Sequence, residues 1–267
     1  MNENAAPHST VAPVVETVLG VQFDKLAGFR SQHYGLFWLK YLEPLGWQTF
    51  TDETPLPTYQ EKFDRARLVR DFNPPSSTLQ VRMKLKNEAR TQTVQIQADK
   101  LYFSWNRDQD GMASYKEVLP VFESLFESYQ QFAVDNSLGQ LTPNLWEITY
   151  INRVPPGSLW QSLADWHRIF PSLFSPKSSD CVGVSLASYD GTWYYEIEPK
   201  AGRISLQVAK MIVNLVPKAV LCFILTGRGE ITNSGRWMDG LDLGHDSCIR
   251  LFRELTSLEA QEEWGLR

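Results

Sequence analysis

The sequence is poor in cysteine and has no metal-binding pattern. Its 267 residues include only Cys181, Cys222 and Cys248, with no CxxC pair and no cysteine–histidine cluster at zinc spacing. An odd number of widely spaced cysteines does not make a disulfide framework. We therefore expect reduced, buried thiols in a cytoplasmic protein, and we predict no metal and no cofactor.

Long apolar runs and a targeting segment are also missing. No stretch of about 18 apolar residues occurs, so we predict no membrane-spanning helix. Residues 1–13 lack the basic and apolar regions of a signal peptide, and we expect a loose N-terminal arm there. The net charge of −5 argues against nucleic-acid binding driven by bulk charge, although it does not exclude a local basic face.

The standard catalytic motifs are absent. There is no Walker loop, no HExxH, no GxSxG at a strand-to-helix turn and no GxGxxG after a strand. Asp190 with Glu198 and Lys200 resembles the acidic residue and E-x-K pair of metal-dependent nucleases, but solvated charges at a hairpin end explain these residues better. His245-Asp246 is best interpreted as a helix entrance at which Asp246 complements the helix dipole. The residues favour a non-enzymatic protein.

What the sequence does contain is a core and regular hydrophobic periodicity. Its 43% hydrophobic residues can bury enough surface to offset chain entropy. For the first half, 14–154, the patterns predict strand Val14–Phe23, a helix around Tyr34 to Leu42, strands Leu79–Lys86 and Thr93–Trp105, a helix after a Ser114–Glu117 capping box, and strand Leu145–Val154. This is the element order of a ferredoxin-like unit.

The second half, 155–267, predicts a helix, an antiparallel meander and a C-terminal helix. The expected elements are helix Leu159–Phe170, strands Val182–Ser188, Thr192–Glu198, Ile204–Ile212 and Val220–Ile231, and a final helix with Cys248, Leu251, Phe252 and Leu255 on its buried stripe. Asp190-Gly191 is a good hairpin turn. We therefore expect an α+β protein whose antiparallel sheet, or two abutting sheets, is covered by helices, with both halves sharing a core.

Two surfaces are candidates for binding. The stretch from Thr226 to Asp246 holds five glycines, and Arg228, Arg236 and Trp237 could present anion-binding and stacking groups there. A flexible connection from a strand to a helix is the alternative. The second surface is basic: Arg82, Lys84 and Lys86 point to one side of an alternating strand, with Arg65, Arg67, Arg70 and Arg90 nearby. Such a face could follow a nucleic-acid backbone, or simply guard a sheet edge.

Three short segments resemble a known family. They are the strand that begins at Pro13 and runs to Phe23, the segment from Glu147 to Arg153 (EITYINR), and the final helix with His245 and Phe252. They are similar to a sporadically distributed family of uncharacterised prokaryotic proteins of about this length. The resemblance implies a bacterial or archaeal protein of patchy occurrence, which by association suggests a mobile or defence-associated gene system. The positions carried over are Glu16, Tyr150, Asn152, Arg153 and His245.

Taken together, the sequence predicts a non-enzymatic interaction protein, an accessory subunit of a bacterial complex with a protein partner. The candidate binding residues are Arg228, Arg236, Trp237, Asn152, Arg153 and His245. The alternative is a nucleic-acid-binding or RNA-processing protein that uses Arg82, Lys84 and Lys86. A metal-dependent nuclease is the third hypothesis. The sequence predicts neither the partner's identity nor the oligomeric state.

Overall fold

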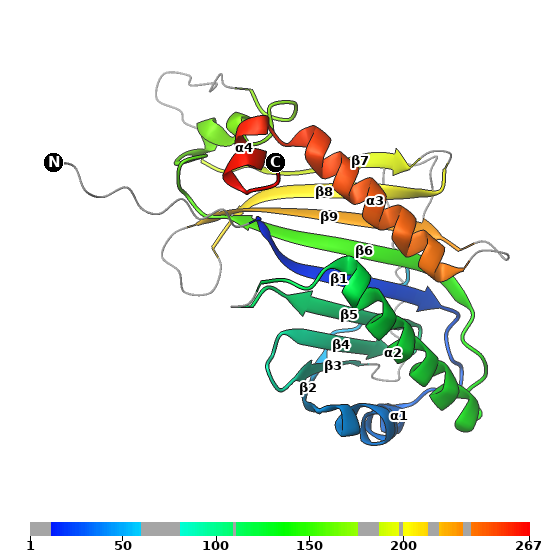
Figure 1. Cartoon of the computed structure of the whole chain (residues 1–267). Coiled ribbons are helices and arrows are strands. Elements are labelled where there is room, and N and C mark those ends of the chain that lie inside the picture. The colour runs from blue at the N-terminus through cyan, green and yellow to red at the C-terminus, as the bar shows by residue number, and fades with distance from the viewer. Residues whose placement is uncertain are drawn as a thin grey trace.

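The computed structural model (Figure 1) describes residues 12–59, 81–108, 111–175, 187–197, 200–212, 219–231 and 236–267. Within these ranges, nine strands form one antiparallel sheet in the order β2-β3-β4-β5-β1-β6-β9-β8-β7. The long strands β1 (Val14–Phe23) and β6 (Pro143–Val154) lie side by side at its centre. The predicted α+β fold, an antiparallel sheet covered by helices, is confirmed.

The elements repeat in the same order along the chain. In the first repeat, β1 is followed by α1 (Ser31–Phe37), a π-helical turn (Trp38–Leu42), a 3-10 turn (Glu43–Leu45), the meander β2 (Trp47–Glu53), β3 (Arg82–Asn87), β4 (Gln92–Gln97) and β5 (Lys100–Asn106), and then α2 (Tyr115–Asp135). In the second repeat, β6 is followed by a 3-10 helix (Leu163–Arg168), the meander β7 (Asp190–Ile197), β8 (Gly202–Met211) and β9 (Val220–Glu230), and then α3 (Trp237–Leu255) and α4 (Leu258–Glu263). The repeats therefore meet where β1 pairs with β6.

Several local expectations need correction. The ferredoxin-like order is not confirmed, because four strands rather than two lie between α1 and α2. The predicted strand 93–105 is the hairpin β4–β5, which turns at Ala98-Asp99. Asp190-Gly191 is not a turn but the start of β7, where it pairs with β8. Most of the predicted strand 182–188 lies outside the described residues.

Helix α2 forms as its sequence predicts. The backbone N–H of Ser114 donates to Glu117 Oε2 at 2.8 Å, and the Ser114 side chain in turn accepts from the Glu117 N–H, so the capping box is present. The apolar stripe of the helix, including Phe122, Tyr129 and Phe132, is buried against the sheet. Alternating residues of the strands face it.

Helix α3 packs on the sheet through glycine. The stretch 226–246, for which the sequence left open a binding surface or a flexible connection, is for the most part the end of β9 and the start of α3. A Cβ at Gly240 would lie 2.2 Å from Trp146 Cδ1, and one at Gly244 would lie 2.5 Å from Trp146 Cζ3. The Trp146 ring thus fills a slot between helix and sheet that only glycine leaves open.

All helices of the described residues lie on one face of the sheet. Figure 1 shows α2 and α3 crossing the strands on the same side. Phe37 of α1 contacts Tyr129 of α2 edge to face, while Phe223 of β9 contacts Phe170 edge to face and stacks with Trp264, so the shorter helices pack on that side as well. No helix in these ranges is long and apolar enough to cross a membrane. The opposite face is called here the helix-free face.

Candidate functional site

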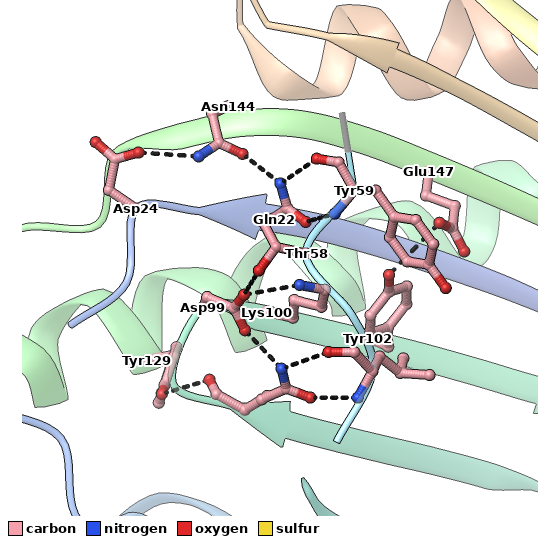
Figure 2. A network of polar contacts seen from close by, with 12 residues as sticks. Gln22, Asp24, Thr58, Tyr59, Asp99, Lys100, Tyr102, Tyr129, Asn144 and Glu147 are labelled. Carbon is pink, nitrogen blue, oxygen red and sulfur yellow. Dashed lines mark hydrogen bonds and ion pairs between the residues drawn. The ribbon is translucent and has the colours of Figure 1, made fainter. Parts of the chain in front are cut away.

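The helix-free face of the first repeat carries a segment of the chain itself. Residues 54–59, which we call the strap, follow β2 and run across the strands (Figure 2). Leu19 and Val21 face the helices, so Gln22, one residue on in β1, points to the opposite side. Gln97 of β4 lies on the same face, because it pairs with Lys100, which in turn pairs with Gln22. These two glutamines hold the strap.

Each glutamine amide binds both backbone groups of one strap residue. Gln97 Oε1 accepts from the Leu56 N–H at 2.8 Å, and Gln97 Nε2 donates to the Leu56 carbonyl at 2.9 Å. Gln22 does the same for Tyr59, accepting from its N–H at 2.8 Å and donating to its carbonyl at 3.0 Å. The pairs satisfy the strap backbone as a neighbouring strand would.

A buried ion pair lies beneath the strap. Lys100 is 0% exposed, and its Nζ lies 2.8 Å from Asp99 Oδ2. Asp99 also accepts from Thr58 Oγ1 at 2.9 Å and from Gln97 Nε2 at 2.8 Å. Burial lowers the pKa of Lys100, and the Asp99 and Glu147 carboxylates oppose this change. The pair is thus compensated where an isolated charge would be very costly.

A second ion pair lies within the second repeat and is contacted by Tyr59 and Tyr102 of the first repeat. Arg228 of β9 donates through Nε to Glu147 Oε2 of β6 at 2.6 Å, and the Tyr59 ring lies 4.0 Å from the guanidinium carbon. The hydroxyl of Tyr102 is 3.5 Å from the same Glu147 oxygen, and its ring lies flat over Gly20, where a Cβ would come within 2.2 Å. Figure 2 shows Tyr59 and Tyr102 converging on Glu147. Arg228, which we expected in a loop, is therefore a half-buried strand residue with a partner.

The other residues predicted in the glycine-rich stretch lie apart from Arg228. Arg236 precedes α3 and has a side chain that is 68% exposed, with Nη2 3.9 Å from Glu123 Oε1. Trp237 packs against Phe122 and Phe126 of α2, with ring centroids 5.4 and 5.1 Å away. Trp237 thus lies on the helix side of the sheet, and the structure does not bring these three residues together.

Tyr150 and His245 meet on the helix side. Their Oη and Nδ1 atoms are 2.5 Å apart, and the Tyr115 ring stacks on His245 with centroids 4.2 Å apart. Tyr115 in turn donates to Asp242 Oδ1 at 2.8 Å. His245 lies in the middle of α3, not at the helix entrance that we predicted. The cluster joins β6 and α3 to the start of α2.

The remaining predicted positions divide between the two faces. Asn152 lies beside the Tyr150 cluster and donates to the carbonyls of Tyr150 and Phe223, each at 3.3 Å. Glu16 and Arg153 point to the helix-free face, where Arg153 pairs with Cys222 across β6 and β9. The five positions suggested by the family resemblance therefore do not form one site.

The basic row is on the helix-free face, at the far end of the first repeat. Arg82, Lys84 and Lys86 alternate with the buried Met83 and Leu85. Arg82 Nη1 donates to Gln95 Oε1 at 2.6 Å, and Lys84 Nζ lies 3.9 Å from Glu53 Oε1. The arginines at 65, 67 and 70 lie outside the described residues.

Two of the three proposed nuclease residues, Asp190 and Lys200, lie at opposite ends of one strand. Asp190 begins β7 and Lys200 follows the other end of that strand, while Glu198 lies outside the described residues. In the described part of the chain, no group of three or more His, Cys, Asp or Glu residues could hold a metal ion.

The second repeat presents an uncharged surface on its helix-free face. Cross-strand register places two rows of four residues side by side on β6, β9, β8 and β7. We call these rows the uncharged patch; its residues are Thr149, Thr226, Ser205 and Tyr194, then Ile151, Ile224, Gln207 and Thr192. Next to the first row lies a charged row of Glu147, Arg228, Arg203 and Glu196.

The patch is accessible at its outer strands. Tyr194 is 48% exposed, and Thr192 and Gln207 are exposed as well. Thr149 Oγ1 and Thr226 Oγ1 are 3.0 Å apart, so part of the patch is hydrogen-bonded within itself. Within the described ranges, no hydrogen bond, ion pair or ring contact joins the patch to a segment outside the sheet.

Comparison with known proteins gives no further guide. No model of a protein family matches the sequence, and no curated protein matches it.

Sequence reasoning missed the strap and its clamps. The signal that could have found them is a pair of glutamines, Gln22 near the end of a mostly apolar strand and Gln97 at the end of an alternating one, both of which are buried. Polar side chains in such places are normally hydrogen-bonded, so they call for a partner from elsewhere in the chain.

Proposed function

We propose that the chain is a non-enzymatic interaction protein, an accessory subunit that binds a partner protein through the uncharged patch of the second repeat. One observation carries the proposal. The helix-free face holds a polypeptide segment over the first repeat, whereas over the second repeat it presents exposed, uncharged hydrogen-bonding side chains.

The composition of the patch supports this function. Protein interfaces are depleted in charge at their centre, enriched in tyrosine and surrounded by a polar rim. The eight patch residues contain no charge, and the charged row with Arg228 and Arg203 borders them. An ordinary solvated sheet face would carry lysine and glutamate among its outward residues. The basic row with Lys84 and Lys86 is an example of that ordinary pattern within the same sheet.

The test is purification of the full chain from its native host, with Tyr194→Ala/Gln207→Arg beside wild type. We expect a stoichiometric protein partner with wild type, identified by mass spectrometry, and at least tenfold weaker binding of that purified partner to the variant. Glu127→Arg, on the exposed side of α2, is the matched control and should bind as wild type. Equal binding by the patch variant, or no partner at all, would contradict the proposal.

Nucleic-acid binding is the second candidate, favoured by the position of Arg82, Lys84 and Lys86 on the helix-free face. If these residues contact phosphates, reversal of all three charges should weaken binding to an oligonucleotide and flatten its dependence on salt. Unchanged binding in the triple variant would exclude this role for the row.

A further inference from the structure

The strap is recognised mainly through its backbone. Gln22 and Gln97 form four hydrogen bonds with the strap, and all four involve the backbone N–H and carbonyl groups of Leu56 and Tyr59. The Thr58 hydroxyl, on Asp99, and the Tyr59 ring, which lies over Arg228 and 5.8 Å from Lys100 Nζ, add side-chain contacts. Backbone bonds that supply affinity, with a few side-chain contacts that select, are the pattern by which sheets bind extended peptides.

The site beneath the strap is polar and retains its own pairs. Lys100 bonds Asp99 at the β4–β5 turn, and Arg228 bonds Glu147 across adjacent strands. Neither pair needs a strap residue to complete it. A segment that only seals a core would pack apolar side chains on an apolar surface, since unpaired buried polar groups are costly. Here the surface presents donors and acceptors spaced to bind a main chain.

We infer that this surface is a binding site for an extended peptide, with Leu56–Tyr59 as its resident ligand. The inference rests on the proposed function in one respect: the incoming peptide is a segment of the partner protein. That segment replaces the strap, offers one backbone N–H and carbonyl pair to Gln97 and another, three residues later, to Gln22, and places an aromatic ring on Arg228. The tethered strap competes at a high effective concentration, so the peptide binds weakly until the strap is displaced.

A peptide that copies Glu53–Tyr59, with blocked ends and a fluorophore, tests the site in the full chain. The host variant is Thr58→Ala/Tyr59→Ala, which weakens the resident strap and leaves both glutamines intact. We expect this variant to bind the peptide at least tenfold more tightly than wild type does. Adding Gln22→Ala and Gln97→Ala should abolish the gain. The control peptide carries N-methyl groups on the Leu56 and Tyr59 nitrogens, which remove the two donors, and should not bind.

Two results would overturn the inference. One is no binding of the peptide to a folded host variant; the other is binding that neither N-methylation of the peptide nor replacement of the two glutamines weakens. Amide hydrogen exchange of the wild-type chain provides a second test that needs no variant. The Leu56 and Tyr59 amides should exchange at least 100-fold faster than that of Phe103 in β5, because the strap opens without unfolding the sheet. Equal protection would show a permanent part of the core and also overturn it.

The outcome is separable from that of the proposed function. If the peptide binds as expected while the patch variants keep their partner, the patch is the wrong interface and the peptide site stands. If the patch variants lose their partner while the peptide fails to bind, the partner uses the patch alone.

Discussion

The two repeats share one order of elements but fill the two sides of the sheet in opposite ways. On the helix side, the fourth and eighth residues of each long helix differ in size. They are Val118 and Phe122 in α2, and Gly240 and Gly244 in α3. The first helix is held off the sheet by its own side chains. The second lies close to the sheet, and the strand residue Trp146 fills the space.

The helix-free side differs as well. The residue before the end of the first strand is Gln22 in β1 and Arg153 in β6. Gln22 is followed across the sheet by Lys100 and Gln97. Arg153 is followed by Cys222 and Ala209. The first of these rows binds a backbone through glutamine amides, and the second row contains no amide side chain. Among the described residues, one arrangement of elements therefore holds a strap in the first repeat and presents exposed side chains in the second.

The largest effect on stability should come from giving each helix the kind of residue that the other has: a small residue in α2 and a large residue in α3. Phe122→Ala leaves a cavity under α2, and we expect it to reduce the free energy of unfolding by about 3–5 kcal/mol. Gly244→Leu forces a side chain against Trp146 and Ile148, whose atoms lie 2.5 and 2.8 Å from the position of a Cβ, and should cost about 3 kcal/mol. Urea denaturation measures both.

Gly35→Ala in α1 is the control for the effect of replacing a helix glycine that has no close neighbour. No atom lies within 4 Å of a Cβ at that position. It should stabilise the protein by up to about 1 kcal/mol through helix propensity. If Gly244→Leu behaved like Gly35→Ala, the close packing of α3 on Trp146 would be refuted.

The next largest effect on stability should distinguish the row of Gln22, Lys100 and Gln97 from the row of Arg153, Cys222 and Ala209. Lys100→Met removes one member of a buried ion pair and leaves Asp99 uncompensated, so we expect a loss of about 3 kcal/mol. Cys222→Val at the matching position of β9 is close to a volume-conserving change and should cost less than about 1.5 kcal/mol. If thermal denaturation showed equal losses of stability for the two variants, the Lys100–Asp99 pair would not contribute more to stability than the matching position of the second repeat.

The comparison of repeats also explains what the sequence could predict. The α2 capping box and its stripe were predictable because local periodicity and a local hydrogen bond decide them. The glycines of α3 were misinterpreted because their purpose is contact with Trp146, about ninety residues away in the chain, and a run of glycines looks the same in a loop.

The repeated topology and the strap site were out of reach for the same reason. The repeats match in topology, while equivalent positions hold different chemistry, such as Phe122 against Gly244. Backbone recognition at Leu56 leaves no side-chain signature, so only the pairing glutamines could have indicated it.

A smaller effect is expected where the repeats are tied together, at His245. Burial lowers the pKa of His245 below its ordinary 6.5, helped by Lys116 and opposed by Asp246 and Asp242, while Tyr150 and Tyr115 contact its ring. The unfolded chain therefore takes up a proton more readily than the folded one, and the stability from this group, full above pH 6.5, is lost as the pH falls.

His245→Gln should cost about 1 kcal/mol at pH 7.5 through the lost Tyr150 hydrogen bond. Between pH 7.5 and 5, its melting temperature should then fall less than that of wild type. Parallel decreases for the two proteins would contradict the assignment of this pH dependence to His245.

The smallest effect on stability is expected at the uncharged patch. Tyr194 and Gln207 are exposed, and we expect Tyr194→Ala and Gln207→Ala each to change the free energy of unfolding by no more than about 0.5 kcal/mol. Tyr59→Ala, on the same face of the first repeat, removes a ring that packs on Arg228 and should cost more, about 1 kcal/mol. Chemical denaturation of the three variants measures this order. A larger loss at Tyr194 than at Tyr59 would mean that the patch contributes to the fold, and the contrast between a strap-covered repeat and an open one would then be wrong.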